Sequence, residues 1–299
     1  MTDNDKQFNK PPQKHMPAIF IGGAGRSGTS LLIELLGKHK DIASIYETQL
    51  ITFLPVRQFP SIIYNKSLND KKIIISDFKL LMSNLIYRYK APWKTRDDGW
   101  RGLFKLFELD EIKSSLELLK LYEKDINEEE SYILFGRFIN DLFCRYAKRM
   151  SKTLWAEKTP ANSRFCDFYY KCFPDLKIIN IIRDGRDMVC SLIKEPWGSN
   201  EPIAGLDDWY AFLAQSFFSQ NDLPLSNCMH VRYENLVTYP EKILKDIIKY
   251  IGLDWDPNML SVKISTQSIG RWKKDLPEEA KEYARSKYGK FLGELGYDV

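Results

Sequence analysis

The sequence contains few of the residues that build metal centres or disulfide frameworks. Among its 299 residues are five cysteines and three histidines, and no cysteines are spaced as C-x-x-C. An odd number of scattered cysteines is typical of reduced thiols in a cytosolic protein rather than of a disulfide scaffold. We therefore expect no metal ion and a cytoplasmic location.

Long apolar runs and a strong excess of one charge are also missing. No run of about 18 apolar residues is present, as a transmembrane helix would need, and residues 1–16 lack the apolar segment of a secretory signal. The formal net charge is only +4, which gives no electrostatic reason to expect nucleic acid. The composition thus predicts no membrane and no nucleic-acid partner, and it does not indicate an oligomeric state.

What the sequence does contain is a cluster of glycines near its start. Residues 18–21 are apolar and predict a short buried strand, residues 22–28 predict a glycine-rich turn, and an apolar helix follows from Thr29 to about Gly37. Glycine lets a backbone fold tightly around an anion, and a helix N-terminus points free N–H groups and a positive dipole toward it. The turn therefore predicts a phosphate or sulfate cradle. The alternative is a βα turn that needs its glycines only for close packing.

The side chains of this turn favour the cradle. Arg26 adds a full positive charge. Hydroxyl donors are supplied by Ser27, Thr29 and Ser30. Gly23 and Gly28 have the separation found in the ATP-binding P-loop, G-x-x-x-x-G-K-[ST], but Thr29 stands where that loop has the lysine for the β and γ phosphates. The cradle is therefore P-loop-like but does not match an ATP site.

Charged residues follow three more predicted strands. Glu47 ends a short apolar run, and Lys158 ends the run that begins at Leu154. Arg183 follows the buried run at residues 176–182. Because ligands of open α/β sheets bind at the carboxyl ends of the strands, these residues are candidates for one site. The alternatives are an exposed loop carboxylate for Glu47 and a solvated lysine for Lys158.

The helix after residues 176–182 carries a second polar motif. Ser191 lies two turns into this helix and can converge with Arg183 on one anion. The charged residues between Arg183 and Ser191 are expected to form local helix caps and ion pairs. These residues are Asp184, Arg186 and Asp187. A further parallel strand begins at Cys228 and ends at Arg232-Tyr233-Glu234.

The repeating strand–helix units predict the fold class. They indicate an α/β protein, a three-layer α/β/α sandwich with a mainly parallel central sheet. Residues 1–16 predict a disordered N-terminal tail and residues 17–299 a single domain, in which residues 55–102 form an irregular substrate-side insertion. Helices are expected at residues 104–124, 131–149, 207–220 and 240–251, and loops at residues 195–206 and 270–274.

Three motifs occur in order along the chain. They are Gly25-Arg-Ser-Gly-Thr-Ser-Leu-Leu32, Ile182-Arg-Asp-Gly-Arg-Asp-Met-Val-Cys-Ser191 and Arg232-Tyr-Glu-Asn-Leu-Val-Thr-Tyr-Pro240. Together they resemble the sulfotransferases that use 3′-phosphoadenosine 5′-phosphosulfate (PAPS), over about residues 17–255 with a weaker tail through Lys274. The resemblance implies a P-loop-like sulfotransferase fold, PAPS as donor, 3′-phosphoadenosine 5′-phosphate (PAP) as product, and no metal.

The resemblance also implies which residues bind the donor. The 5′-phosphosulfate falls to Arg26, Ser27, Gly28, Thr29 and Ser30. The 3′-phosphate falls to Arg183 and Ser191, and Tyr233 contacts the nucleotide. The loop that closes over the adenosine corresponds to residues 265–274, with candidates Ser265, Arg271, Trp272 and Lys273.

Within the family, the chain is most similar to the tyrosylprotein sulfotransferase-like branch and its bacterial relatives. In that branch a Glu-Thr pair after the cradle supplies the general base, which assigns this role to Glu47. The lysine before a proline turn corresponds to Lys158, and Arg26 joins it in stabilising charge on the transferred group. His39 resembles a structural histidine after the cradle helix.

The chain departs from the tyrosylprotein enzymes at two places. Gln49 replaces the arginine that holds an acidic peptide, and Lys194-Glu195 replaces a further basic residue after the second motif. These differences favour a small-molecule acceptor, a hydroxyl or amine of a metabolite or natural product. The alternatives are a tyrosylprotein or carbohydrate sulfotransferase, a P-loop ATP-dependent kinase, and a non-catalytic nucleotide-binding scaffold.

Overall fold

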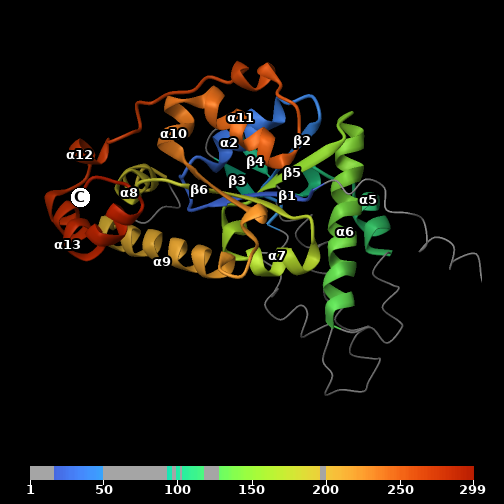
Figure 1. Ribbon diagram of the computed structural model, residues 1–299, viewed down its shortest axis with the longest axis horizontal. Helices are drawn as coiled ribbons and strands as arrows, with labels where there is room; N and C mark the ends of the chain where they lie inside the picture. The colour runs from blue at the N-terminus through green and yellow to red at the C-terminus, as the bar shows by residue number, and fades with distance from the viewer. Residues whose placement is uncertain (1–16, 50–92, 96–98, 102, 118–127, 196–199) are drawn as a thin grey trace, which may run out of the picture.

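The computed structural model describes residues 17–49, 93–95, 99–101, 103–117, 128–195 and 200–299 (Figure 1). The expected tail at residues 1–16 lies outside the described residues, as do most of the expected insertion at 55–102 and part of the expected loop at 195–206. The extent of the domain and the roles of these segments therefore stay predictions.

A five-stranded parallel sheet forms the centre of the molecule. Its strands stand in the order β2-β5-β1-β6-β7, and every neighbouring pair is parallel. They are β1 (Ile19–Gly23), β2 (Ile42–Tyr46), β5 (Leu154–Lys158), β6 (Lys177–Ile182) and β7 (Cys228–Arg232). A separate antiparallel pair consists of β3 (Trp93–Thr95) and β4 (Gly99–Arg101). The predicted parallel sheet is confirmed. Its strands are nearly continuous apolar runs, which suit a sheet that is covered on both faces.

Helices cover both faces of this sheet. In the described ranges they are α2 (Thr29–Gly37), α5 (Leu109–Leu116), α6 (Glu128–Arg149), α7 (Cys166–Cys172), α8 (Gly185–Leu192), α9 (Pro202–Gln220), α10 (Tyr233–Thr238), α11 (Pro240–Ile251), α12 (Trp272–Asp275) and α13 (Glu278–Glu294). Figure 1 shows α2, α10 and α11 on one side of the sheet and α7 and α9 on the other. The predicted three-layer α/β/α sandwich is confirmed.

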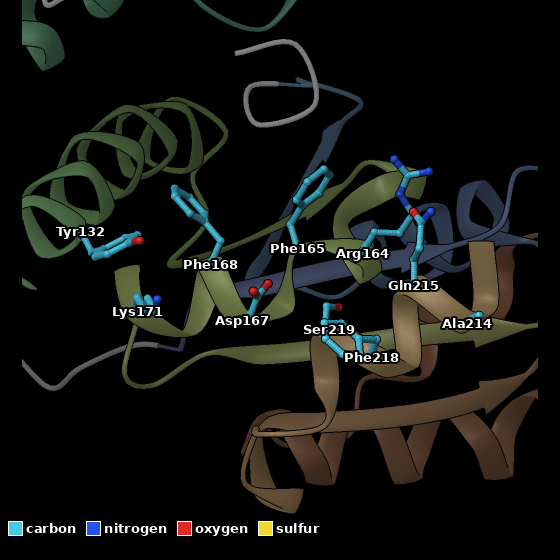
Figure 2. Close-up of a pocket in the computed structure, with 10 residues that line it drawn as sticks. All are labelled: Tyr132, Arg164, Phe165, Asp167, Phe168, Lys171, Ala214, Gln215, Phe218 and Ser219. Carbon is cyan, nitrogen blue, oxygen red and sulfur yellow. The ribbon is translucent and has the colours of Figure 1, made fainter. Parts of the chain in front are cut away.

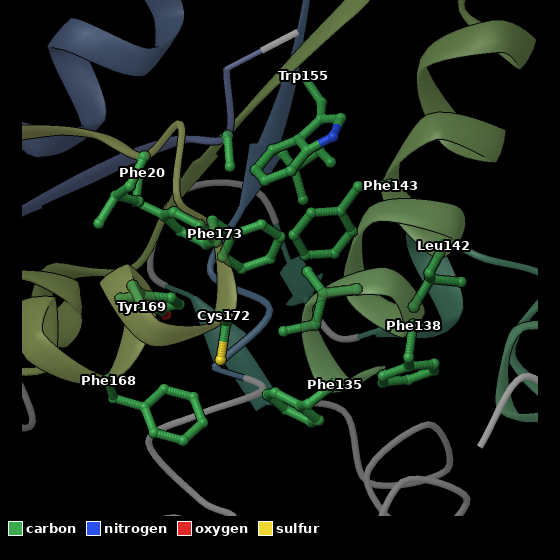
Figure 3. Close-up of a cluster of buried hydrophobic side chains, with 14 of the residues drawn as sticks. Phe20, Phe135, Phe138, Leu142, Phe143, Trp155, Phe168, Tyr169, Cys172 and Phe173 are labelled. Atoms are coloured by element: carbon green, nitrogen blue, oxygen red, sulfur yellow. The ribbon is translucent and has the colours of Figure 1, made fainter. Parts of the chain in front are cut away.

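The alternating side chains of β1 divide the core into two halves. Ile19 and Ile21 pack with α2, α10 and α11, whereas Phe20 packs with α6 and α7, because successive side chains of a strand point to opposite faces. Phe20 stacks on Tyr169 with ring centroids 4.0 Å apart and meets Trp155 edge to face at 5.3 Å. Figure 3 shows the aromatic side chains of α6 and α7 that fill this half. A third apolar cluster joins α8, α9 and α13.

The carboxyl ends of the parallel strands meet at one edge of the sheet. Glu47 follows β2, Lys158 ends β5, Arg183 follows β6 and Tyr233 follows β7, while the glycine-rich turn follows β1. The register pairs Tyr46 with Lys158, which brings the ends of β2 and β5 level. The fold therefore gathers the residues that each sequence motif supplies.

Some element bounds differ from those expected. Helix α9 begins at Pro202 rather than Asp207, because proline is well suited to the first turn of a helix. Residues 272–275 form the short helix α12, which overlaps the loop expected at 270–274. Of the expected helix at 104–124, residues 109–116 form α5, whose N-terminus carries a reciprocal capping box between Glu108 and Glu111.

Candidate active site

The turn between β1 and α2 is tight and leaves the helix N-terminus open. Gly28 is the N-cap of α2, with a φ of 96°, and no side chain caps the helix there. A Cβ on Gly28 would lie 2.4 Å from the Tyr233 ring, and one on Gly23 would lie 2.4 Å from the Ile181 carbonyl oxygen. Close packing is therefore sufficient to explain why glycine stands at both positions. The number of glycines alone does not distinguish an anion cradle from a close-packed turn.

Two buried polar atoms beside the turn favour the anion cradle. Ser27 Oγ and Arg183 Nε are both buried, and neither has a hydrogen-bond partner among the described residues. Buried polar groups are normally paired, so two unpaired ones at one site need an explanation. The N-terminus of α2, which no side chain caps, follows Ser27 directly and adds the positive end of the helix dipole. A phosphate or sulfate group at the turn would supply an acceptor for Ser27 Oγ, and a second anionic group beside Arg183 would supply one for its Nε.

Lys158 is a buried cation that joins Glu47 to the cradle helix. Its side chain is 0% exposed, and Nζ donates to Ser30 Oγ at 3.0 Å and forms an ion pair with the Glu47 carboxylate. The Tyr46 ring centroid lies 5.4 Å from Nζ. This burial excludes the solvated-lysine alternative, and the ion pair removes the exposed-loop alternative for Glu47. A carboxylate and an ammonium group therefore lie together at the N-terminus of α2.

Arg183 connects the second motif to the cradle and to the segment before α12. Its two terminal nitrogens donate to the carbonyl oxygens of Arg26 at 2.8 Å and of Ser268 at 2.9 Å. Its guanidinium carbon lies 4.5 Å from the Tyr233 ring centroid, and the Tyr233 hydroxyl lies 2.7 Å from Ser268 Oγ. Residues from all three sequence motifs thus meet at one place.

The Arg26 side chain lies away from the position that the resemblance implies. Its Nε donates to Ser191 Oγ at 3.1 Å, and its Nη2 lies 3.0 Å from the Glu195 carboxylate. Arg26 is assigned to the 5′-phosphosulfate, whereas Ser191 is assigned to the 3′-phosphate. The guanidinium would have to turn back toward the cradle to act on the transferred group. The Glu195 carboxylate, just after the end of α8, thus holds the guanidinium away from the cradle.

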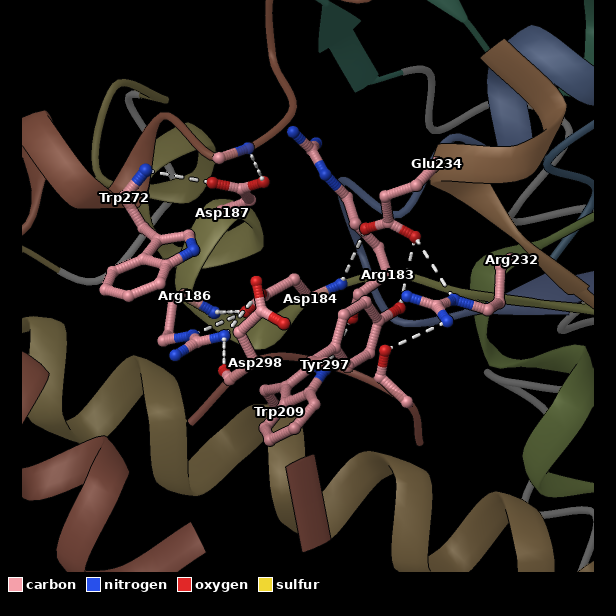
Figure 4. A network of polar contacts seen from close by, with 12 residues as sticks. Arg183, Asp184, Arg186, Asp187, Trp209, Arg232, Glu234, Trp272, Tyr297 and Asp298 are labelled. Atoms are coloured by element: carbon pink, nitrogen blue, oxygen red, sulfur yellow. Dashed lines mark hydrogen bonds and ion pairs between the residues drawn. The ribbon is translucent and has the colours of Figure 1, made fainter. Parts of the chain in front are cut away.

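Asp187 fixes the segment that corresponds to the closing loop. Its carboxylate accepts the backbone N–H groups of Gly270 at 2.7 Å and Trp272 at 2.9 Å (Figure 4). Burial raises the pKa of Asp187, and these two N–H groups oppose the rise. Trp272 stacks on Arg186, whose guanidinium carbon is 3.8 Å from the ring centroid. The expectation of only local contacts for Asp187 is wrong, because its partners come from a distant segment that packs on α8.

The other candidates in the closing loop lie apart from this cluster. Arg271, the N-cap residue of α12, pairs with Asp275 at 2.8 Å. Ser265 and Lys273 are both exposed, and the Ser265 hydroxyl accepts a backbone N–H from Gln267 at 3.3 Å. In the described ranges, none of the three forms a hydrogen bond or ion pair with the residues assigned to the 3′-phosphate. Their contact with a donor stays a prediction.

A second polar network fixes the backbone around Arg183 (Figure 4). Asp184 caps α8, as the sequence predicts. Glu234 accepts the Asp184 N–H at 3.0 Å and the Tyr297 hydroxyl at 3.2 Å, and burial raises its pKa. Trp209 donates its indole N–H to the Arg183 carbonyl at 3.2 Å. Contacts from α9, α10 and the C-terminal residues therefore hold the second motif in place.

A separate cleft of about 620 Å³ opens between α7 and α9. Figure 2 shows its aromatic lining from Tyr132, Phe165, Phe168 and Phe218, with Arg164 at one end. None of the residues assigned from the sequence lines this cleft. The cleft therefore shares no lining residue with the Glu47–Lys158 site.

Four residues in this region were not assigned to the site from the sequence. They are Glu157, Asp187, Glu195 and Ser268. Ser268 lies in the expected closing loop, but its surroundings in the sequence do not distinguish it from Ser265. Glu157 has the only usable signal, a charged residue inside a strand that is otherwise apolar apart from the terminal Lys158.

Three further features concern the described part of the chain. No helix in the described ranges is both long enough and apolar enough to cross a membrane. In the same part of the chain, no group of three or more His, Cys, Asp or Glu side chains is placed to hold a metal ion. The five cysteines are free thiols.

Comparison with known proteins places these motifs in a family. A sequence model of the sulfotransferase family matches residues 17–257. The protein-tyrosine sulfotransferase of Drosophila melanogaster is 23% identical over 267 residues, which cover 86% of this chain and 42% of that protein. Protein-tyrosine sulfotransferase 1 of Danio rerio is 22% identical over 300 residues, which cover 96% of this chain and 68% of that protein. The chain thus spans less than half of the first relative and about two thirds of the second.

Two solved structures share the fold. The sulfotransferase domain from the curacin biosynthetic pathway has a TM-score of 0.55 and 16% identity, covering 96% of this chain and all of that one. The sulfotransferase domain from the Synechococcus PCC 7002 olefin synthase has a TM-score of 0.50 and 18% identity, covering 97% of this chain and 98% of that one. At such identities the likeness concerns the fold alone.

Proposed function

The chain belongs to the sulfotransferase family, and we propose that it transfers a sulfuryl group from PAPS to a hydroxyl or amine acceptor. One observation carries the proposal. The buried ammonium of Lys158 contacts both the Glu47 carboxylate and Ser30 in the first turn of α2. A proton acceptor and a fixed cation therefore lie side by side at an anion cradle, as sulfuryl transfer requires.

The residues at the sheet edge fit the donor. PAPS supplies a sulfuryl group on a phosphate leaving group. Ser27, whose hydroxyl is buried and unpaired, and the N–H groups of Gly28, Thr29 and Ser30 would hold the 5′ end. Arg183, Ser191 and Tyr233 would hold the 3′-phosphate and nucleotide, with the unpaired Arg183 Nε as a ready donor. Arg26 would join the 5′ side after leaving Glu195.

The proposed chemistry uses two side chains directly. Glu47 accepts the proton of the acceptor hydroxyl or amine while the acceptor atom forms its bond to sulfur. The bond from sulfur to the phosphate oxygen breaks, and the phosphate leaves with the bonding electrons. Lys158 and the N–H groups of α2 stabilise the negative charge that develops on the sulfuryl and phosphate oxygens.

A ligand-binding assay tests the donor assignment against the kinase alternative. We expect PAP to raise the melting temperature and ATP with Mg²⁺ to leave it unchanged, because Thr29 replaces the P-loop lysine. PAP at 100 times its Kd adds ~2.7 kcal/mol to the free energy of unfolding, which is about 5 °C for a domain of this size. Stabilisation by ATP with Mg²⁺ alone would overturn the donor assignment. Transfer of labelled sulfate from PAPS then separates an enzyme from a non-catalytic scaffold.

For the acceptor, we favour a small-molecule hydroxyl or amine over a protein tyrosine. The support is Gln49, which replaces the arginine that holds an acidic peptide in tyrosylprotein enzymes, together with the replacement of a further basic residue around Lys194-Glu195. We expect mass spectrometry to find sulfated products in a panel of small hydroxyl and amine compounds and none from an acidic tyrosyl peptide. Sulfation of the peptide alone would assign a tyrosylprotein enzyme, and sulfation of a glycan would assign a carbohydrate enzyme. The expected cytoplasmic location stays a prediction.

A further inference from the structure

Glu157 is a buried carboxylate that the proposed chemistry does not use. It stands directly before Lys158 in β5 and is 1% exposed. Because side chains alternate along a strand, Glu157 and Lys158 point to opposite faces of the sheet. No Lys or Arg of the described ranges forms an ion pair with Glu157. A buried carboxylate without a cation is costly unless hydrogen bonds compensate it, so its partners reveal its role.

Four donors converge on this carboxylate. Oε1 accepts the Thr48 N–H at 3.0 Å, the Thr48 hydroxyl at 2.9 Å and the Thr159 hydroxyl at 2.7 Å. Oε2 accepts the Asn162 side-chain amide at 2.7 Å, and Asn162 also donates to the Ile21 carbonyl at 3.1 Å. The carboxylate thus joins the ends of β2, β5 and β1.

Two of these donors flank the proposed catalytic pair. Thr48 directly follows Glu47, and Thr159 directly follows Lys158. The Glu47 backbone is in the left-handed region, with a φ of 44°, and so is that of Gln49, with a φ of 50°. This conformation is unfavourable for residues with a side chain and persists only where surrounding contacts hold it. Between these two residues, the Thr48 backbone N–H and hydroxyl are both bound to Glu157.

We infer that Glu157 is a positioning residue for sulfuryl transfer. It anchors Thr48 and Thr159, and through them it holds the left-handed turn that brings the Glu47 carboxylate onto Lys158. The Glu47 N–H donates to the Lys158 carbonyl at 2.6 Å, which completes the connection between the two chain segments. The inference rests on the proposed function, since it explains how the base of that reaction is held.

Glu157→Gln tests the inference with almost no change of volume. An amide presents one oxygen and one NH₂ group, so it cannot accept hydrogen bonds from all four donors, and at least one loses its partner. We expect kcat for sulfate transfer to fall about 10- to 100-fold, because a displacement near 1 Å at a reacting group can cost that much. The Kd for PAP should change less than about threefold, since the donor contacts lie on other residues.

The inference can also be tested without changing Glu157, by comparing Thr48→Val with Thr48→Ser. This comparison still decides the matter if Glu157→Gln fails to fold. Valine keeps the shape of threonine but removes the hydroxyl donor to Glu157, whereas serine keeps it. We expect kcat to fall about fivefold for Thr48→Val and to stay near the wild-type value for Thr48→Ser.

Asp256→Asn is a control for the loss of a buried carboxylate elsewhere. Asp256 is 5% exposed and accepts the N–H groups of Lys40 at 2.7 Å and Asn258 at 3.0 Å. Lys40 precedes the N-terminal end of β2, whereas Glu47 follows its C-terminal end. This variant should melt earlier and keep its kcat. A Glu157→Gln variant that behaves in the same way, with a fully active Thr48→Val variant, would overturn the inference.

Crystal structures of the wild type and of Glu157→Gln test the positioning role without a measurement of turnover. A wild type that transfers no sulfate from PAPS would refute the proposed function. The structural inference would then be judged from the Glu157→Gln structure alone. Displacement of Glu47 from Lys158 supports it, and an unchanged ion pair refutes it.

Discussion

Replacing Glu47 with glutamine is expected to lower kcat for sulfate transfer by about 10²- to 10⁴-fold, the usual contribution of a positioned general base. The Glu47 carboxylate lies against the buried Lys158 ammonium, and glutamine preserves the shape of this side chain but not its ability to take a proton. The Kd for PAP should stay within about twofold, because other residues are assigned to the nucleotide. Transfer of labelled sulfate gives kcat, and isothermal titration with PAP gives Kd.

The matched control for Glu47→Gln is Glu241→Gln. Glu241 is an exposed carboxylate of α11 that pairs with Lys245 at 2.7 Å, and surface pairs of this kind contribute little. This control should keep both kcat and Kd. If Glu47→Gln retains a kcat within about threefold of the wild type, another group accepts the proton. A large rise in Kd with normal kcat would instead assign Glu47 to donor binding.

The sequence alone could predict where the functional strands end. Arg183 follows an apolar run of the length and composition of a buried strand, Lys158 ends a run that is apolar up to Glu157, and Glu47 follows a shorter run. The carboxyl ends of parallel strands lie at one edge of the sheet. The sequence therefore predicts that these residues lie at that edge, even when the order of the strands is unknown. The fold class followed from the same repeats.

The directions of the side chains could not be predicted in this way. Arg26 is next to Ser27 in the cradle, yet its guanidinium contacts Ser191, which is 165 positions away. The two N–H partners of Asp187 lie 83 and 85 positions further along the chain. Such contacts depend on how α8 packs against the segment before α12, and no local pattern specifies that packing. Sequence motifs therefore indicate membership of a site better than they indicate roles within it.

Replacing Arg183 with alanine is expected to raise the Kd for PAP about 100-fold or more. The guanidinium bonds the carbonyl oxygens of Arg26 and Ser268 and keeps a buried Nε without a partner in the described part of the chain. Hydrogen bonds to charged groups are worth ~1.5–3 kcal/mol each, and ~1.4 kcal/mol corresponds to a tenfold change in affinity. The kcat at saturating PAPS should fall less than about tenfold, because Glu47 and Lys158 are untouched.

Arg183→Lys separates the charge of this residue from its geometry. Lysine keeps the positive charge, but a single ammonium group cannot reproduce the planar guanidinium that spans two carbonyl oxygens and faces Tyr233. We expect an intermediate rise in Kd of about tenfold. Arg145→Lys is the matched control, because Arg145 pairs with Asp141 at 2.8 Å on the exposed side of α6 and should bind PAP as the wild type does. An unchanged Kd in Arg183→Ala would refute the 3′-phosphate assignment. Wild-type binding by Arg183→Lys, with loss in Arg183→Ala, would show that charge alone holds the anion.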